Sequence, residues 1–273
     1  MQATSYIIRG GVEGRERQRL LSRLMRPTTL GLFERIGLRT GLVCLDVGCG
    51  GGDVTFDLAR IVGSAGRVLG IDIDETVLEL TRGEAAALRL GNVEFRKSGI
   101  MDGDIGSGFD IVYARFLLTH LNDPLSALVK MGRALKPGGL VVVEDIDFTG
   151  HFCHPKSTAF WRFVELYSQT VRRRDGDPNI GPRLPRLLID LGCEGVQINV
   201  VQPAGIEGEV KLIHPITMES ITNAVLASGL STQKEVEDII TELYKLARDS
   251  RTVMSLPRVV QAWGCWPASG SGR

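Results

Sequence analysis

The hydrophobic pattern changes character along the chain. In the first forty residues the apolar positions, such as Leu20 and Leu24, fall on one face of a helix. Proline fixes its own backbone and removes a hydrogen-bond donor, so Pro27 is expected to divide this stretch into two helices. Thr28 or Thr29 is positioned to cap the second helix.

The centre of the chain alternates short, nearly continuous apolar runs with stretches of helical spacing. Such runs are typical of parallel strands buried on both faces. We expect strands at 42–47, 67–72, 92–96, 109–114 and 140–144, and helices at 53–62, 74–90, 116–120 and 123–135. Beyond residue 150 the pattern predicts an amphipathic helix around Phe160–Tyr167, a helix over 184–191, a strand over 195–202, helical structure over 216–249 and a last strand over 258–263.

Composition narrows the possible classes of protein. The 273 residues carry 32 Lys and Arg against 32 Asp and Glu, so the net charge is zero and no nucleic-acid partner is expected. The five cysteines are odd in number and form no CxxC pair, which favours a reducing cytoplasm. We expect neither a signal peptide nor a membrane span, because no sufficiently long apolar run occurs.

A glycine-rich loop follows the first predicted strand, in the run Asp46-Val47-Gly48-Cys49-Gly50-Gly51-Gly52. Glycines permit unusual backbone angles and let a ligand approach the main chain. Asp72 ends the next strand, where an acid can accept hydrogen bonds from ribose hydroxyls. Asp53 stands where a dinucleotide-binding loop has its third glycine, and Asp46 would repel a pyrophosphate. These residues favour a nucleoside ligand that carries a positive ammonium group.

Four motifs in order resemble class I S-adenosylmethionine-dependent methyltransferases, especially the small-molecule branch with the ubiquinone and menaquinone C-methyltransferases. They are DVGCGGG at 46–52, GIDID at 70–74, FDIVYARFLLTHL at 109–121 and LKPGG at 135–139. The resemblance implies an α/β, Rossmann-like doubly wound sheet with strand order 3-2-1-4-5-7-6 and an antiparallel seventh strand. It also implies S-adenosyl-L-methionine as the cofactor.

The resemblance also assigns residues to parts of that cofactor. Asp46, Gly48 and Gly50 would border its methionine end, Asp72 would bind the ribose, and Ile73 would lie beside the adenine.

Further positions follow from the same resemblance. Many members carry a Gly-Asp pair after the third strand, where this chain has Ser98-Gly99. Adenine would then contact Gly99 and Ile100, or Asp102 would replace the missing carboxylate. Arg115 would lie near the sulfonium, and Tyr6 would contact the ligand from an N-terminal cap.

Histidines are the candidate bases for the acceptor. His120 follows the fourth strand, and His154 follows the fifth, where the substrate pocket should open. We consider both as catalytic candidates, beside the alternatives that His120 is structural and that the loop holding His154 has no catalytic role. The spacing of His151, Cys153 and His154 does not indicate a metal site, and none is expected.

These observations predict an N-terminal helical cap over 1–40, a cofactor-binding core over 41–205 plus 257–267, and a helical lid insertion over 206–256. An enclosed pocket and a neutral charge favour O-, N- or C-methylation of a small organic molecule by in-line displacement, with catalysis mainly by positioning. RNA or protein methylation and non-methylating chemistry on the same fold remain alternatives. A monomer or a homodimer is expected.

Overall fold

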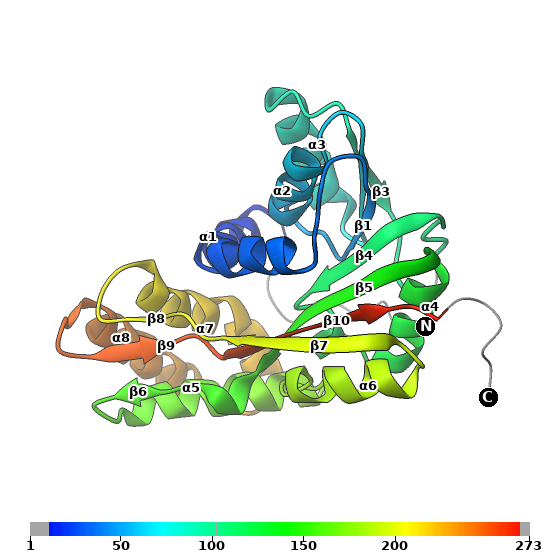
Figure 1. Ribbon diagram of the computed structural model, residues 1–273. Helices are drawn as coiled ribbons and strands as arrows, with labels where there is room; N and C mark the ends of the chain where they lie inside the picture. The colour runs from blue at the N-terminus through cyan, green and yellow to red at the C-terminus, as the bar shows by residue number, and fades with distance from the viewer. Residues whose placement is uncertain (1–10, 102, 268–273) are drawn as a thin grey trace.

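A seven-stranded sheet forms the centre of the computed structural model, which describes residues 11–101 and 103–267 (Figure 1). Its order is β3-β2-β1-β4-β5-β10-β7, and β10 is antiparallel to both β5 and β7. This confirms the predicted topology, with β7 and β10 as the sixth and seventh strands. The strands are β1 (Val43–Val47), β2 (Arg67–Asp72), β3 (Val93–Lys97), β4 (Phe109–Arg115), β5 (Leu135–Asp147), β7 (Glu194–Val201) and β10 (Arg258–Cys265).

Helices cover both faces of this sheet, as the apolar runs predicted. Alternating side chains of one strand reach opposite layers: Cys44 packs with α1 and α2, whereas Leu45 packs with α4 and α6. The helices of these layers are α1 (Gly11–Arg35), α2 (Asp53–Val62), α3 (Glu75–Ala87), α4 (Pro124–Arg133) and α6 (Leu184–Asp190), with short 3₁₀ turns η1 (Leu118–His120), η2 (Phe148–Gly150) and η3 (Gly181–Arg183).

Helix α1 runs unbroken through Pro27, so the predicted division into two helices is wrong. Met25 and Leu32 are fully buried on either side of the proline, and this packing outweighs one lost backbone hydrogen bond. The two threonines do not cap a second helix. Thr28 donates its hydroxyl to the Met25 carbonyl at 2.8 Å, and Thr29 donates to the Glu144 carboxylate at 2.9 Å.

A second apolar cluster lies beside the sheet, between α5 (Thr158–Arg172), α7 (Glu209–Ala227) and α8 (Gln233–Arg248). The helical structure expected over 216–249 is therefore two helices, separated near Gly229, whose φ is +64°. A small sheet of order β6-β9-β8 joins this layer, from β6 (Cys153–His154), β9 (Val253–Ser255) and β8 (Ala204–Gly205). Strands of two or three residues have too little periodicity to be predicted.

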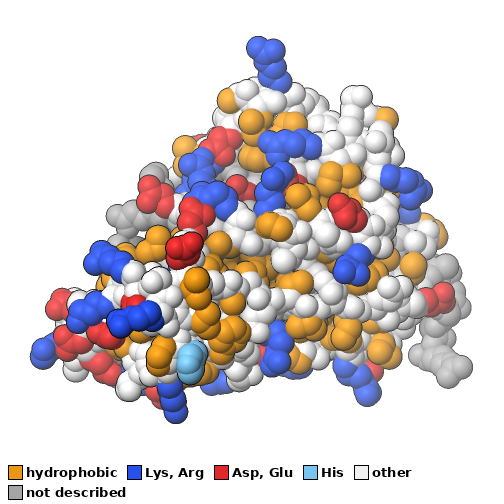
Figure 2. All heavy atoms as spheres, turned by 60° about the vertical axis from the view of Figure 1, so that its left-hand side comes forward, with side chains coloured by type: hydrophobic (Ala, Val, Ile, Leu, Met, Phe, Trp, Pro, Cys, Tyr) orange, Lys and Arg blue, Asp and Glu red, His pale blue; other side chains and the backbone are white. Residues whose placement is uncertain are grey.

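Positive and negative side chains alternate over the face that presents α1 and α7, between groups of apolar residues (Figure 2). Across residues 11–101 and 103–267, no helix has both the length and the apolar character that crossing a bilayer requires.

Candidate functional site

A cavity of about 790 Å³ opens at the carboxyl ends of β1, β2 and β4. One half is bounded by the glycine loop and the ends of β2 and β3. The other half extends between α1, α5 and α7, and its walls are largely apolar and aromatic. Both halves meet near the end of β4 and the residues that follow it, including Arg115, Phe116 and His120.

The glycine loop is shaped by positions that a larger residue would disturb. Gly48 has φ +72°, and a Cβ atom there would lie 3.1 Å from Leu117 Cδ1. Gly52, just before α2, has φ +76°, and a Cβ atom would come within 2.4 Å of Thr81 Cγ2. The loop therefore packs closely between α3 and the turn after β4, which leaves its main chain open to the cavity.

Asp72 links the end of β2 to the glycine loop. Its carboxylate accepts hydrogen bonds from the Gly50 N–H at 2.9 Å and from the Asp74 N–H at 3.0 Å. Burial raises its pKa, against the lowering effect of these backbone donors. The carboxylate lines the cavity in a fixed orientation, with further lone pairs available to hydroxyl donors.

Asp46 lies at the end of β1 and is only 2% exposed. The Thr55 hydroxyl donates to its Oδ2 at 2.6 Å. Burial raises the pKa of Asp46 to about 6, although Thr55 and the charge of Arg115 oppose that rise. A buried carboxylate with a raised pKa gains most from a cationic ligand, which stabilises its ionised form.

The remaining residues expected beside the cofactor also line the cavity, where they are described. Ile73 is 57% exposed and lies next to Gly99, whose Cβ position would be 3.3 Å from Ile73 Cγ2. Ile100 is buried at the same end. Tyr6 and Asp102 lie outside the described residues.

Arg115 is held at the end of β4 by two hydroxyl groups of α1. Its guanidinium donates to Thr29 Oγ1 and to Ser22 Oγ, both at 3.1 Å. The guanidinium also lies 5.6 Å from the ring centre of Phe116, a residue with φ +55°. A left-handed phenylalanine is uncommon, and here its residue contributes to the wall of the cavity.

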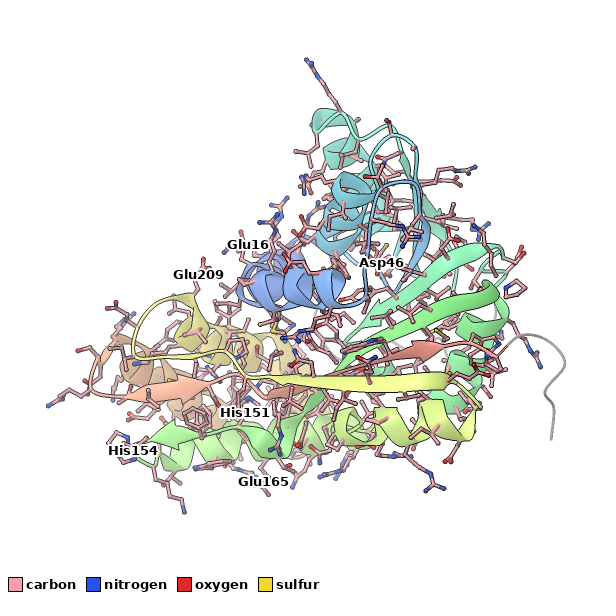
Figure 3. The ribbon with its side chains drawn as sticks, viewed as in Figure 1. Glu16, Asp46, His151, His154, Glu165 and Glu209 are labelled. Atoms are coloured by element: carbon pink, nitrogen blue, oxygen red, sulfur yellow. The ribbon has the colours of Figure 1, made fainter. Side chains whose placement is uncertain are left out.

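The two predicted catalytic histidines have different locations. His120 lines the cavity, and burial lowers its pKa to about 3, together with the charges of Arg17 and Arg174. His154 is exposed on β6 and does not line the cavity. Figure 3 shows it at the outer end of β6, whereas His151 lies inward, on the wall of the cavity.

The apolar half of the cavity is built around Phe148. Its ring stacks on Tyr167 with centroids 4.0 Å apart and planes 9° apart, and it meets the His151 ring edge-on at 4.4 Å. His151 Nδ1 donates to the Phe148 carbonyl at 2.9 Å, which leaves Nε2 of the neutral ring as an acceptor. Burial lowers the pKa of His151 to about 3 and that of His214 to about 4.

Helix α1 contributes a row of side chains that the motifs did not reveal. Arg17, Gln18, Leu21, Ser22 and Met25 all line the cavity. Their spacing of three and four residues is that of one helical face. The same spacing was visible in the sequence, where its apolar members indicated only packing. Within residues 11–101 and 103–267, no group of three His, Cys, Asp or Glu side chains is placed to hold a metal ion.

Residues 38–170 match the methyltransferase domain family. This region of the chain is therefore similar to a methyltransferase domain. The match ends within α5, so α7, α8, β8 and β9 lie outside it. The cavity combines a glycine-loop half from the matched region with walls from outside it, on α1 and α7.

The chain is similar to two curated proteins and to one solved structure. A demethylmenaquinone methyltransferase of Lactococcus lactis is 36% identical over 140 residues, which cover 51% of this chain and 53% of that protein. A demethylmenaquinone methyltransferase of Staphylococcus aureus is 42% identical over 141 residues, with 51% and 55% covered. The chain spans about half the length of the curated relatives it matches. A putative methyltransferase of Bacillus halodurans shares the fold, with 18% identity, a TM-score of 0.60, and 88% and 100% of the chains covered.

Proposed function

We propose that the protein transfers a methyl group from S-adenosylmethionine to a small organic acceptor held in the cavity. One observation carries this proposal. Asp46 near the end of β1 and Asp72 at the end of β2 both lie beside the glycine loop, in a cavity that continues into an aromatic chamber. The first half suits a nucleoside with an ammonium group, and the second half suits an apolar acceptor.

The residues present fit S-adenosylmethionine at the glycine loop. Asp46 would hold the ammonium group, and Asp72 would accept hydrogen bonds from the ribose hydroxyls. Gly48 and Gly50 would let the methionine end approach the main chain. The adenine would rest against Ile73, Gly99 and Ile100. When bound, the cofactor supplies a methyl group activated by the positive sulfur.

The chain's own contribution would be positioning. Arg115 is fixed by Thr29 and Ser22, and Phe116 lines the cavity beside it. Aligning the acceptor with the methyl group lowers the activation barrier of an in-line displacement by several kcal/mol, without a covalent intermediate. His120 would act in this arrangement as a neutral hydrogen-bonding group, since its pKa is lowered to about 3. The exposed position of His154 gives no support to a catalytic role.

We further propose that the chain is organised as a helical cap over 1–40, a core over 41–205 plus 257–267 and a lid over 206–256. In this arrangement α1 and α7 close the cavity and exclude water and macromolecular substrates. A quinol-like aromatic acceptor is the first candidate, supported by the aromatic walls and by the names of the two curated relatives.

Native mass spectrometry of freshly purified protein, followed by analysis of the released ligands, tests the cofactor. Release of S-adenosylmethionine or S-adenosylhomocysteine is expected, and release of a dinucleotide would contradict the proposal. Transfer of a labelled methyl group from the cofactor to quinols and phenols then tests the reaction. A panel of RNA and protein substrates serves as the comparison, and labelling confined to those substrates would contradict a small-molecule acceptor.

A further inference from the structure

Arg17 brings an unusual charge into the half of the cavity that faces away from the glycine loop. Its side chain projects from α1, is 8% exposed and lines the cavity. Its Nε donates to Thr217 Oγ1 of α7 at 3.0 Å. Thr217 in turn donates its hydroxyl to the Ile213 carbonyl at 2.6 Å, so its oxygen is fixed as the acceptor for Arg17.

The rest of this guanidinium lacks partners among the residues that the structure describes. No carboxylate among the side chains described in residues 14–101 and 103–267 forms an ion pair with Arg17, and Nε makes its one hydrogen bond to them, to Thr217. A guanidinium has five N–H donors, so four remain for a ligand. Burying a cation without a counter-charge is costly, which favours an anion beside it.

The distribution of charge around the cavity indicates that this anion is part of the methyl acceptor. Among the described residues, the carboxylates that line the cavity all belong to the glycine-loop half: Asp46, Asp53, Asp72, Asp74 and Glu75. The walls near Arg17 are apolar or aromatic, with three histidines. We propose that Arg17, positioned by Thr217, forms an oxyanion site for the methyl acceptor, which is an aromatic or enolic molecule bound with its oxygen ionised. This inference rests on the proposed function.

The cofactor carries a carboxylate of its own, which is the competing occupant. Adjacent residues of α1 face these two possible occupants. A Cβ atom on Gly50 would lie 3.6 Å from Gln18 Oε1, so Gln18 faces the glycine loop. Arg17 is turned about 100° from Gln18 on the helix and contacts α7 instead. Gln18 is therefore the neighbour of the cofactor, and Arg17 is the neighbour of the acceptor.

An ionised acceptor also removes the need for a strong base. Its oxygen, or a carbon conjugated with it, forms a bond to the methyl group while the methyl–sulfur bond breaks and leaves its electron pair on sulfur. No proton has to leave in this step. His120, His151 and His214 all have lowered pKa values, so they are weak bases. Arg17 instead stabilises the acceptor in its ionised form, so that no histidine has to deprotonate it.

The test compares two probes of similar shape, 4-nitrophenolate and neutral 4-nitroaniline, on the full chain saturated with S-adenosylhomocysteine. Wild type should bind the phenolate at least about tenfold more tightly than the aniline. Arg17→Gln should reduce that preference to about onefold while changing the affinity for S-adenosylhomocysteine by less than about twofold. Arg17→Lys should retain part of the preference, which shows that the loss is one of charge and not of folding.

Arg23→Gln is the matched control, because Arg23 also joins α1 to α7, through an exposed ion pair with Glu209. It should keep the full preference. No preference in wild type, or a full preference in Arg17→Gln, would overturn the proposal. Weaker S-adenosylhomocysteine binding by Arg17→Gln with the probe preference intact would assign Arg17 to the cofactor carboxylate instead. Failure of wild type to bind S-adenosylhomocysteine would contradict the proposed function, and the two probes would still report on Arg17.

Discussion

The carboxylate of Asp72 accepts a hydrogen bond from the main-chain N–H of Gly50 at 2.9 Å. This bond ties the end of β2 to the middle of the glycine loop. The side chain assigned to the ribose thus also fixes the loop assigned to the methionine end. Cofactor affinity and loop geometry are expected to depend on the same carboxylate.

Asp72→Ala is therefore expected to weaken binding of S-adenosylmethionine by at least about tenfold, or about 1.4 kcal/mol. Calorimetric titration measures this directly. Asp123→Ala is the matched control, because Asp123 also accepts a backbone hydrogen bond, from Ser126 at 3.0 Å, but lies outside the cavity. Equal affinities for Asp72→Ala and wild type would refute the ribose assignment.

The raised pKa of Asp46 predicts a pH dependence of cofactor binding. Since this pKa is about 6 in the free protein, the carboxylate is largely protonated at pH 5 and ionised above pH 7. An ammonium ligand favours the ionised form, so affinity should rise as pH increases through 6 and then level off. The Asp46→Asn variant should bind weakly with no such rise. A flat profile for wild type would argue against contact between Asp46 and the ammonium group.

Gly52 and Gly83 form a pair that separates loop geometry from helix propensity. Gly52→Ala introduces a Cβ atom 2.4 Å from Thr81 Cγ2 at φ +76°, and should destabilise the fold by roughly 2–4 kcal/mol. Gly83 lies within α3 with open space around its Cβ position. Gly83→Ala should stabilise by up to about 1 kcal/mol. Urea unfolding measures both, and a neutral Gly52→Ala would contradict the tight packing of the loop.

Buried His214 predicts a loss of stability in acid. Its folded pKa is lowered to about 4 and its unfolded pKa is near 6.5, so the unfolded chain binds a proton first as pH falls. The stability from this group is present above pH 6.5 and is lost as pH falls from 6.5 towards 4. His214→Gln should reduce the slope of unfolding free energy in that window by up to about 1.4 kcal/mol per pH unit.

The exposed histidine of β6 gives the control for that experiment. His154→Gln is the matched control, because it makes the same substitution at an exposed side chain outside the cavity. An unchanged slope in His214→Gln would mean that His214 does not remain neutral in the folded protein.

The sequence predicted the sheet well because its strands are buried on both faces and alternate with helices. Cys44 and Leu45 illustrate this, since adjacent residues enter opposite apolar layers. Pro27 misled the prediction because local propensity favours a break there, whereas burial of Met25 and Leu32 maintains the helix. Local sequence contains no information on which distant surfaces will bury a helix.

The residues of the site also divide into those set by local sequence, which could be predicted, and those set by distant contacts, which could not. The positions near the glycine loop depend on short motifs that follow successive strands, and Asp46, Asp72 and Gly99 all line the cavity. The acceptor half depends on contacts across the chain, such as the one between Arg17 and Thr217, which are 200 residues apart. The sequence places His151 and His154 together in the loop after the fifth strand, and the structure shows that His151 lines the cavity whereas His154 does not.

Calorimetric titration of the wild-type protein with S-adenosylhomocysteine, beside a parallel titration with NAD, tests the central claim most directly. We predict saturable binding of S-adenosylhomocysteine to one site per chain. We predict no binding of NAD, because Asp46 repels a pyrophosphate. Binding of NAD without binding of S-adenosylhomocysteine would contradict the assignment of the glycine loop, Asp46 and Asp72 to a methyl-donor site.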